Sequence, residues 1–200
     1  MFDESFRTRF AGWVKPLAPP LARLGVTANH VTIVSFLLTL VAAALIADGR
    51  SFTGLAIWIL SRIGDGLDGV LARDAAQTSA FGGYLDITLD MAGYAAMVVG
   101  FAVAHPALWL AWLAVLAGYV VVITTTLALS DAARRSGRHV SLTNRTFLFT
   151  PALTEAGETS VMYGVWVVFP QQLPWLVWVW VAALAITTVQ RTVLAWRLLR

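Results

Sequence analysis

Six apolar stretches constrain this sequence more than any other feature, because each has about the length that a helix needs to cross a lipid bilayer. Polar or proline-containing breaks lie at four of the five junctions between them, at residues 48–50, 105–106, 130–139 and 170–174. A chain that crosses lipid must satisfy its backbone hydrogen bonds internally, which favours helices. The sequence therefore predicts an all-α membrane protein, a single domain over residues 1–200 with a six-helix bundle over 29–200. The expected spans are residues 31–47, 52–71, 81–104, 107–129, 147–169 and 173–195.

Residues 1–28 differ from the rest because they mix basic and bulky apolar side chains and contain three prolines. This pattern predicts an amphipathic helix that lies along the membrane surface. The alternative is an irregular lead-in to the first span.

The basic residues indicate how the spans are oriented. With six spans and a cytoplasmic N-terminus, twelve of the fourteen Lys and Arg residues fall on the cytoplasmic side, while Arg50 lies outside and Arg62 lies within the second span. Such an asymmetry predicts that both termini are cytoplasmic. The twelve are Arg7, Arg9, Lys15, Arg23, Arg73, Arg134, Arg135, Arg138, Arg145, Arg191, Arg197 and Arg200.

Composition narrows the classes of function. The chain is 58% hydrophobic and 12% charged, contains no cysteine, and has three histidines that are far apart in sequence. A disulfide or cysteine metal site is excluded, and a zinc site is disfavoured. The net charge of +3 fits contact with membrane lipids rather than with nucleic acid.

Four aspartates lie where a carboxylate is costly. Asp65 and Asp68 are three residues apart in the second apolar segment, and Asp86 and Asp90 are four apart in the third. Each pair therefore shares one helix face. In an antiparallel hairpin that turns near residue 77, Asp65 lies level with Asp90, and Asp68 with Asp86. The acids are expected to face one another just below the cytoplasmic surface.

Four facing carboxylates must either take up protons or be neutralised by cations. Hard divalent ions such as Mg²⁺ or Mn²⁺ prefer oxygen ligands, and a two-ion site is suited to phosphoryl transfer. The alternative is an internal ion-pair network with Arg62 and Arg73, but two arginines would leave a surplus of acid. Ionisable groups within a membrane favour a functional site.

The spacing of these residues resembles the signature of the CDP-alcohol phosphotransferases. That pattern is D-x-x-D-G-x-x-A-R, eight residues, G, three residues, D, three residues, D, and every spacing matches here. The matching residues are Asp65, Asp68, Gly69, Ala72, Arg73, Gly82, Asp86 and Asp90.

The resemblance implies a transferase that moves a phosphatidyl group from CDP-diacylglycerol, or a similar CDP-linked lipid, to a small polar alcohol and releases CMP. Asp65, Asp68, Asp86 and Asp90 would hold two ions, Mg²⁺ or Mn²⁺, and Asp90 would be the catalytic base. It also suggests a homodimer. The donor would be bound by Asn29, Thr32, Asp65, Gly66, Asp68, Gly69, Ala72, Arg73 and Gly82.

The acceptor pocket is expected near the fifth segment, whose acids reach a similar depth. The alternatives are that Glu155 or Glu158 pairs with Arg62, and that the arginines contact anionic lipid. The stretch at residues 76–90 is similar to that in phosphatidylinositol synthases but is too short to choose the alcohol. The candidate acceptor residues are Thr154, Glu155, Glu158, Thr159, Arg138 and Arg145.

Two other classes of function are alternatives to the transferase. One is a divalent-cation transporter or channel, although the acids cluster toward one face and no inverted repeat is visible. The other is an inactive scaffold, which the complete aspartate set disfavours. The expected location is a multi-pass integral membrane protein, in the inner membrane if bacterial, with the active site facing the cytoplasm.

Overall fold

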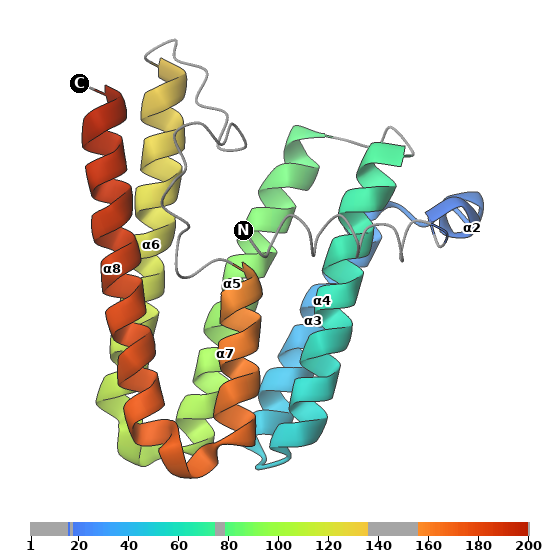
Figure 1. Cartoon of the computed structure of the whole chain (residues 1–200). Coiled ribbons are helices and arrows are strands. Elements are labelled where there is room, and N and C mark those ends of the chain that lie inside the picture. The colour runs from blue at the N-terminus through green and yellow to red at the C-terminus, as the bar shows by residue number, and fades with distance from the viewer. Residues whose placement is uncertain (1–15, 17, 75–78, 136–155, 200) are drawn as a thin grey trace. The chain divides into compact units, whose positions relative to one another are not determined.

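The computed structural model describes residues 16, 18–74, 79–135 and 156–199 (Figure 1). Within these residues every regular element is a helix, which confirms the all-α prediction. The chain divides into two compact units, Met1–Ala107 and Leu108–Arg200; the expected single domain stays a prediction. The elements are α2 (Ala18–Arg23), α3 (Ala28–Ala47), α4 (Ser51–Asp74), α5 (Ala80–Ala104), η2 (Pro106–Leu108), α6 (Trp109–Arg135), α7 (Ala156–Val168), η3 (Pro170–Gln172) and α8 (Leu173–Leu199).

Local sequence explains where the helices of the first unit begin and end. Thr27 and His30 form a capping box at the start of α3, and the Ser79 side chain caps α5 by accepting a hydrogen bond from the Gly82 amide at 2.9 Å. Such caps satisfy amide groups that have no partner in the first turn. Between α3 and α4, Gly49 has a φ of +81°, which glycine adopts without the strain that a Cβ would cause.

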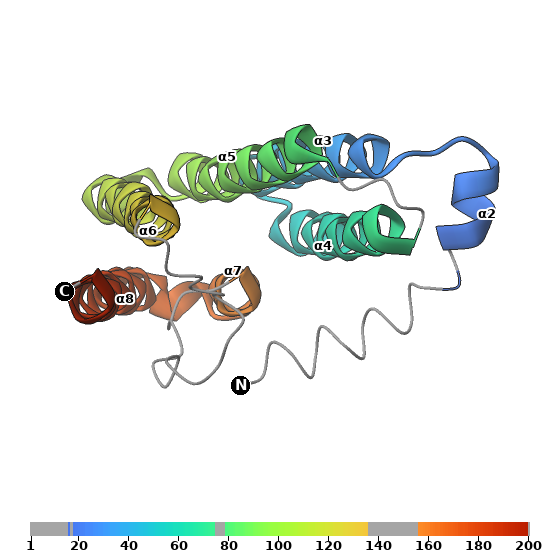
Figure 2. The ribbon, with the colours of Figure 1, turned by 90° about the horizontal axis from the view of Figure 1, so that it is seen from above.

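The first unit is built on α3, which packs against both α4 and α5 (Figure 2). Its core includes the fully buried side chains of Ile46, Trp58, Met97 and Phe101. Close approach of α3 and α5 depends on Gly100, where an added Cβ would lie 2.5 Å from the Ala43 carbonyl oxygen. Small residues allow such backbone contacts between membrane helices.

Gly100→Ala is therefore expected to lower the free energy of unfolding by about 1–3 kcal/mol, because the clash is with backbone that cannot move aside without separating the helices. The gain in helix propensity from Gly to Ala, about 0.5–1 kcal/mol, is too small to offset this. The thermal unfolding midpoint in detergent measures the effect. Gly83→Ala is the matched control on the same helix, since a Cβ there meets nothing within 4 Å. Equal midpoints for the two variants would contradict the close approach.

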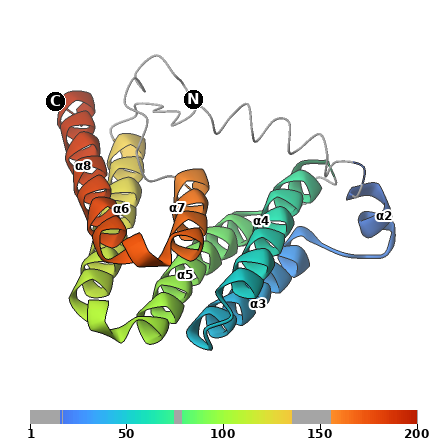
Figure 3. The same cartoon turned by 60° about the horizontal axis from the view of Figure 1, so that its bottom comes forward.

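In the second unit α6 and α8 lie side by side, and α7 leads into α8 through η3 (Figure 3). The interior combines apolar and polar contacts. The Trp180 indole donates to the Tyr119 hydroxyl at 3.1 Å, which lies 3.1 Å from the Tyr163 hydroxyl. Arg191 of α8 donates to the Val122 carbonyl of α6 at 3.0 Å. These polar groups are thus paired across helices, as an apolar environment favours.

Four of the described helical segments are long and apolar enough to cross a membrane, namely Ala28–Ala47, Ala80–Ala104, Pro106–Arg135 and Pro170–Leu199. Large apolar side chains on their outer faces are more than half exposed, among them Val103, Val120 and Val189. Apolar surface on this scale is typical of contact with lipid. The second expected span corresponds to α4, which carries more charge, and α7 is the described part of the fifth.

One expected boundary is wrong. The break predicted over residues 130–139 begins too early, because α6 continues through Arg135. Asp131 accepts hydrogen bonds from Arg134 at 3.1 Å and from Arg135 at 2.8 Å. These pairs, three and four residues apart, add support to the last turn of a helix.

Candidate metal centre and active site

Three of the four aspartates come together in the first unit. Asp65 and Asp68 project from α4 and Asp86 projects from α5, and one oxygen of each lies within 4.8 Å of the others. The i, i+3 spacing on α4 puts the first two on one face. The antiparallel hairpin supplies the third acid from the opposite helix. The juxtaposition of these three acids, expected from their spacing, is present.

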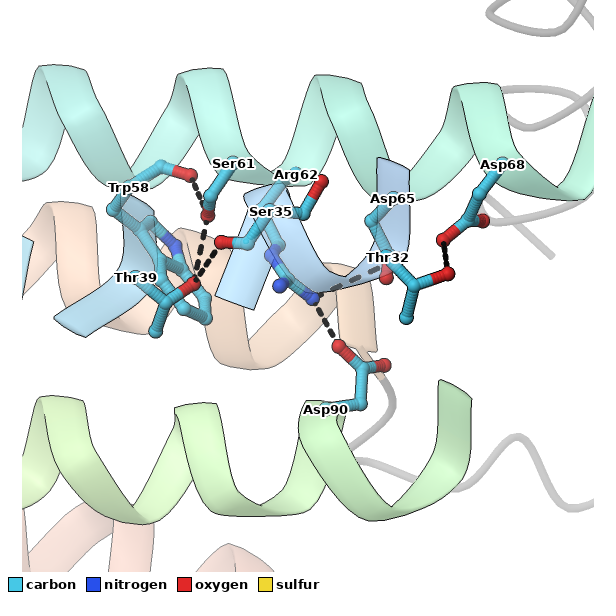
Figure 4. Close-up of polar contacts among 9 residues, drawn as sticks. All are labelled: Thr32, Ser35, Thr39, Trp58, Ser61, Arg62, Asp65, Asp68 and Asp90. Carbon is cyan, nitrogen blue, oxygen red and sulfur yellow. Dashed lines mark hydrogen bonds and ion pairs between the residues drawn. The ribbon is translucent and has the colours of Figure 1, made fainter. Parts of the chain in front are cut away.

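A hydrogen bond from α3 fixes the orientation of Asp68. The Thr32 hydroxyl donates to Asp68 Oδ2 at 2.6 Å (Figure 4) and also approaches the Ala28 carbonyl at 3.1 Å. Both side chains are buried, with Asp68 only 6% exposed. The sequence predicts nucleotide binding by Thr32 but gives no sign of this contact with Asp68.

Asp90 lies outside the three-carboxylate group and forms an ion pair with Arg62. Arg62 Nη1 of α4 donates to Asp90 Oδ1 at 2.5 Å and lies 3.6 Å from Asp65 Oδ2 (Figure 4). The ion pair is largely shielded from solvent, with side-chain exposures of 16% for Arg62 and 19% for Asp90. The roles of Asp90 as base and as metal ligand therefore stay predictions, and its observed partner is Arg62.

Two aromatic rings enclose the same arginine. The Arg62 guanidinium carbon lies 4.5 Å from the ring centroid of Trp58 and 5.5 Å from that of Tyr94. A cation close to an aromatic face is attracted by the ring quadrupole. Neither ring is among the site residues predicted from the sequence. Their positions, four residues before Arg62 and four after Asp90, are a spacing that could have pointed to them.

The expected donor-binding residues fall on α3, α4 and α5 of the first unit. A Cβ built on Gly82 would lie 3.1 Å from Asn29 Oδ1, so α3 and α5 meet closely here. A Cβ on Gly69 would lie 3.4 Å from Arg73 Nη1, which places the guanidinium over that glycine. Ala72 packs against an apolar cluster of Ala28, Val70 and Leu71, and Gly66 lies within α4.

The expected acceptor residues are only partly within the described chain. Thr154, Glu155, Arg138 and Arg145 lie outside the described residues. Thr159 is buried on α7, and Glu158 beside it has a buried carboxylate oxygen, Oε2, with no hydrogen-bond partner among the described residues. Within the described part of the chain the ion pairs of Arg62 are with Asp65 and Asp90, not with a glutamate.

The three-carboxylate group suits a hard divalent cation. Its donors are all carboxylate oxygens, which Mg²⁺ and Mn²⁺ prefer, and they are close enough to share one ion. A neighbouring carboxylate with a fixed orientation can serve as a proton acceptor. A divalent cation held here could bind phosphate oxygens, and the carboxylate of Asp90 could accept a proton from a hydroxyl group beside them.

Comparison with known proteins agrees with these observations. The family model described as CDP-alcohol phosphatidyltransferase matches residues 25–189. The inner membrane protein YnjF of Escherichia coli (strain K12) is 33% identical over 178 residues, which are 85% of this chain and 83% of that protein. The archaetidylinositol phosphate synthase of Methanothermobacter thermautotrophicus is 34% identical over 99 residues, 49% of this chain and 51% of the synthase.

Solved structures of Mycobacterium tuberculosis phosphatidylinositol phosphate synthase resemble the fold. The complex of that synthase with manganese and citrate matches with a TM-score of 0.74 and 26% identity, over 92% of this chain and 88% of the synthase. Its complex with CDP-DAG matches with a TM-score of 0.68 and 23% identity, over 92% of this chain and 93% of the synthase.

Proposed function

Because the chain belongs to the CDP-alcohol phosphatidyltransferase family, a family of membrane enzymes of phospholipid synthesis, we propose that it transfers a phosphatidyl group from CDP-diacylglycerol to a small polar alcohol. The observation that carries the proposal is the group of Asp65, Asp68 and Asp86, whose oxygens lie within 4.8 Å of one another on two helices. The alcohol oxygen forms a bond to the phosphorus that carries the lipid, and the bond to CMP breaks.

The three aspartates would hold divalent cations, together with Asp90 if two ions bind. Bound cations would offset the negative charge of the pyrophosphate and of the leaving CMP. Support comes from the all-oxygen donor set and from the manganese in the structure of the mycobacterial relative. Mg²⁺ and Mn²⁺ are the cations to test.

Asp90 would accept the proton of the acceptor hydroxyl as that oxygen attacks phosphorus. Arg62 binds only Oδ1 of this carboxylate among the described residues, which leaves Oδ2 available to a hydroxyl group. A base must lie within hydrogen-bond reach of the proton it removes. Asp90 would meet this requirement with the acceptor hydroxyl bound beside its Oδ2.

The CMP part of the donor would lie against Asn29, Gly66, Gly69, Arg73 and Gly82. The Arg73 and Asn29 side chains lie close to Gly69 and Gly82, so phosphate oxygens that approach the backbone at these glycines would meet a guanidinium and an amide group. Thr32 and Ala72 would act indirectly. Thr32 orients Asp68, and Ala72 packs the end of α4.

The names of the relatives favour a phosphorylated inositol as the first acceptor to test. Two kinds of relative are named as synthases of inositol phosphate lipids, one archaeal and one mycobacterial. Arg138 and Arg145 would bind the acceptor phosphate, and Thr154, Glu155, Glu158 and Thr159 would line the rest of the pocket.

The proposed topology has six spans and cytoplasmic termini. The four apolar helices, α4 and the fifth segment would be the six spans. The distribution of arginines orients them. Arg73, at the last turn of α4, would then mark the cytoplasmic surface, with the active site just below it. The assembly would be a homodimer, as the family resemblance suggests.

The experiment that tests the proposal offers labelled CDP-diacylglycerol and a panel of alcohols to the purified protein with Mg²⁺ or Mn²⁺. The panel includes inositol phosphate, inositol, glycerol 3-phosphate and serine. We expect CMP release that depends on one alcohol and a lipid product that contains it. The absence of CMP release with every alcohol, in protein that is folded and binds Mn²⁺, would contradict the proposed transfer; metal flux into liposomes would then favour a transporter.

A further inference from the structure

Two pairs of residues at helical spacing face one another across α4 and α5, and of these four residues only Asp90 belongs to the family signature. Trp58 and Arg62 lie on α4, and Asp90 and Tyr94 lie on α5, each pair four residues apart. The two aromatic rings meet edge to face at a centroid distance of 5.6 Å, and both are almost fully buried. The arginine is therefore held in a cradle that both helices build.

The position of the guanidinium is defined by contacts on several sides. Nη1 contacts Asp90 Oδ1 at 2.5 Å and lies 3.6 Å from Asp65 Oδ2, and the ring faces of Trp58 and Tyr94 lie within cation–π distance. A planar guanidinium can stack on rings and donate in its own plane at the same time. The Arg62 side chain thus links Asp90 to Asp65, one of the three carboxylates within ligand distance of one another.

Stability alone is a weak reason for an arginine at this place. A largely buried ion pair loses so much hydration that well-packed apolar residues of similar volume often stabilise a protein as well or better. The same unit already packs α3 against α4 and α5 through glycine contacts and an apolar core. The charge and the geometry of Arg62 therefore call for a role in the site.

We propose that Arg62 is a positioning residue, which holds Asp90 by one oxygen and supplies a fixed positive charge that limits how tightly the neighbouring acids bind divalent cations. The first task rests on the proposed function, because it keeps the other oxygen of Asp90 directed to the acceptor hydroxyl. The second task rests only on the contact of Arg62 with Asp65 and Asp90. Together these two tasks explain why the positively charged side chain of Arg62 lies among four acids.

The test compares Arg62→Met and Arg62→Lys with Arg50→Met as the matched control. Arg50 pairs with Asp48 in an exposed turn, with a side-chain exposure of 68%, so its loss should leave the site unchanged. Mn²⁺ affinity is measured on each substrate-free protein by electron paramagnetic resonance. Steady-state CMP release then gives kcat and the KM for the donor, and the thermal unfolding midpoint reports folding.

For Arg62→Met we expect Mn²⁺ to bind about tenfold more tightly, because a positive charge beside the acids is lost. We expect kcat to fall about 10–100-fold with the KM for the donor within about threefold, because the base is misplaced while the donor contacts remain. Arg62→Lys should keep the Mn²⁺ affinity within about twofold but lower kcat about tenfold, because an ammonium lacks the planar fork.

Two results would overturn the proposal. One is an Arg62→Met protein that binds Mn²⁺ no more tightly than the Arg50→Met control, which would show that the charge does not act on the acids. The other is an unchanged kcat in Arg62→Lys, the variant that decides if the methionine variant fails to fold. A wild-type protein without CMP release would refute the transferase proposal, and the substrate-free Mn²⁺ titrations would still decide the charge effect of Arg62.

Discussion

Asp90→Asn should lower the rate of CMP release about 10²–10⁴-fold, the range that a general base contributes, while CDP-diacylglycerol still binds. The amide has the size of the carboxylate but cannot accept the hydroxyl proton. Donor binding should persist because Asp65, Asp68 and Asp86 keep their mutual distances without Asp90, which lies outside their group. Turnover with labelled donor and equilibrium binding of the same donor measure the two effects separately.

Asp48→Asn is the matched control for this substitution. Asp48 is an exposed aspartate at the end of α3 that pairs with Arg50 at 2.9 Å, far in sequence from the acids of α5. Its turnover should equal that of the wild type. Near wild-type turnover in Asp90→Asn would refute the assignment of Asp90 as the base and would not bear on Asp65, Asp68 and Asp86 as metal ligands.

Much of the fold could be predicted because a helix that crosses lipid must be apolar along its length, so the ends of an apolar run lie near the ends of a helix. Residues 31–47 and 173–195 were expected as spans, and the helices α3 and α8 contain them. The break expected from residue 130 is wrong because the charged residues there continue the helix to Arg135. Asp131 forms ion pairs with Arg134 and Arg135 along one face of the same helix. This local effect needs no contact with another helix, and composition alone does not show it.

The site was predictable to the level of helix faces but not of individual contacts. Spacing alone brings Asp65, Asp68 and Asp86 to one place, because helix geometry leaves few other positions for them. Which oxygen contacts which neighbour depends on rotamers and on a third helix. The bond from Thr32 to Asp68 joins residues 36 positions apart, and the Arg62–Asp90 pair competes with every other acid nearby. No periodicity in the sequence distinguishes among those partners.

Removal of divalent cations should stop the reaction, and Mg²⁺ or Mn²⁺ should restore it. At the residue level, Asp68→Asn should weaken Mn²⁺ binding and lower turnover at least about 10³-fold, since electrostatic stabilisation of charge in the transition state is usually the largest contribution to catalysis. Asp68 is the most buried of the three acids. Thr32 holds its Oδ2 at 2.6 Å, so the other oxygen has a defined direction that an amide nitrogen would spoil.

Asp131→Asn on α6 provides the control, because Asp131 is a more exposed acid whose partners are two arginines of its own helix. Mn²⁺ titration of the substrate-free protein and CMP release after treatment with a chelator measure the two consequences independently. Thr32→Val should reproduce part of the Asp68→Asn effect, because it removes the bond that orients the carboxylate and leaves the carboxylate in place. Activity that persists in metal-free buffer, or an Asp68→Asn protein with the Mn²⁺ affinity of the control, would exclude the three-carboxylate group as the metal centre.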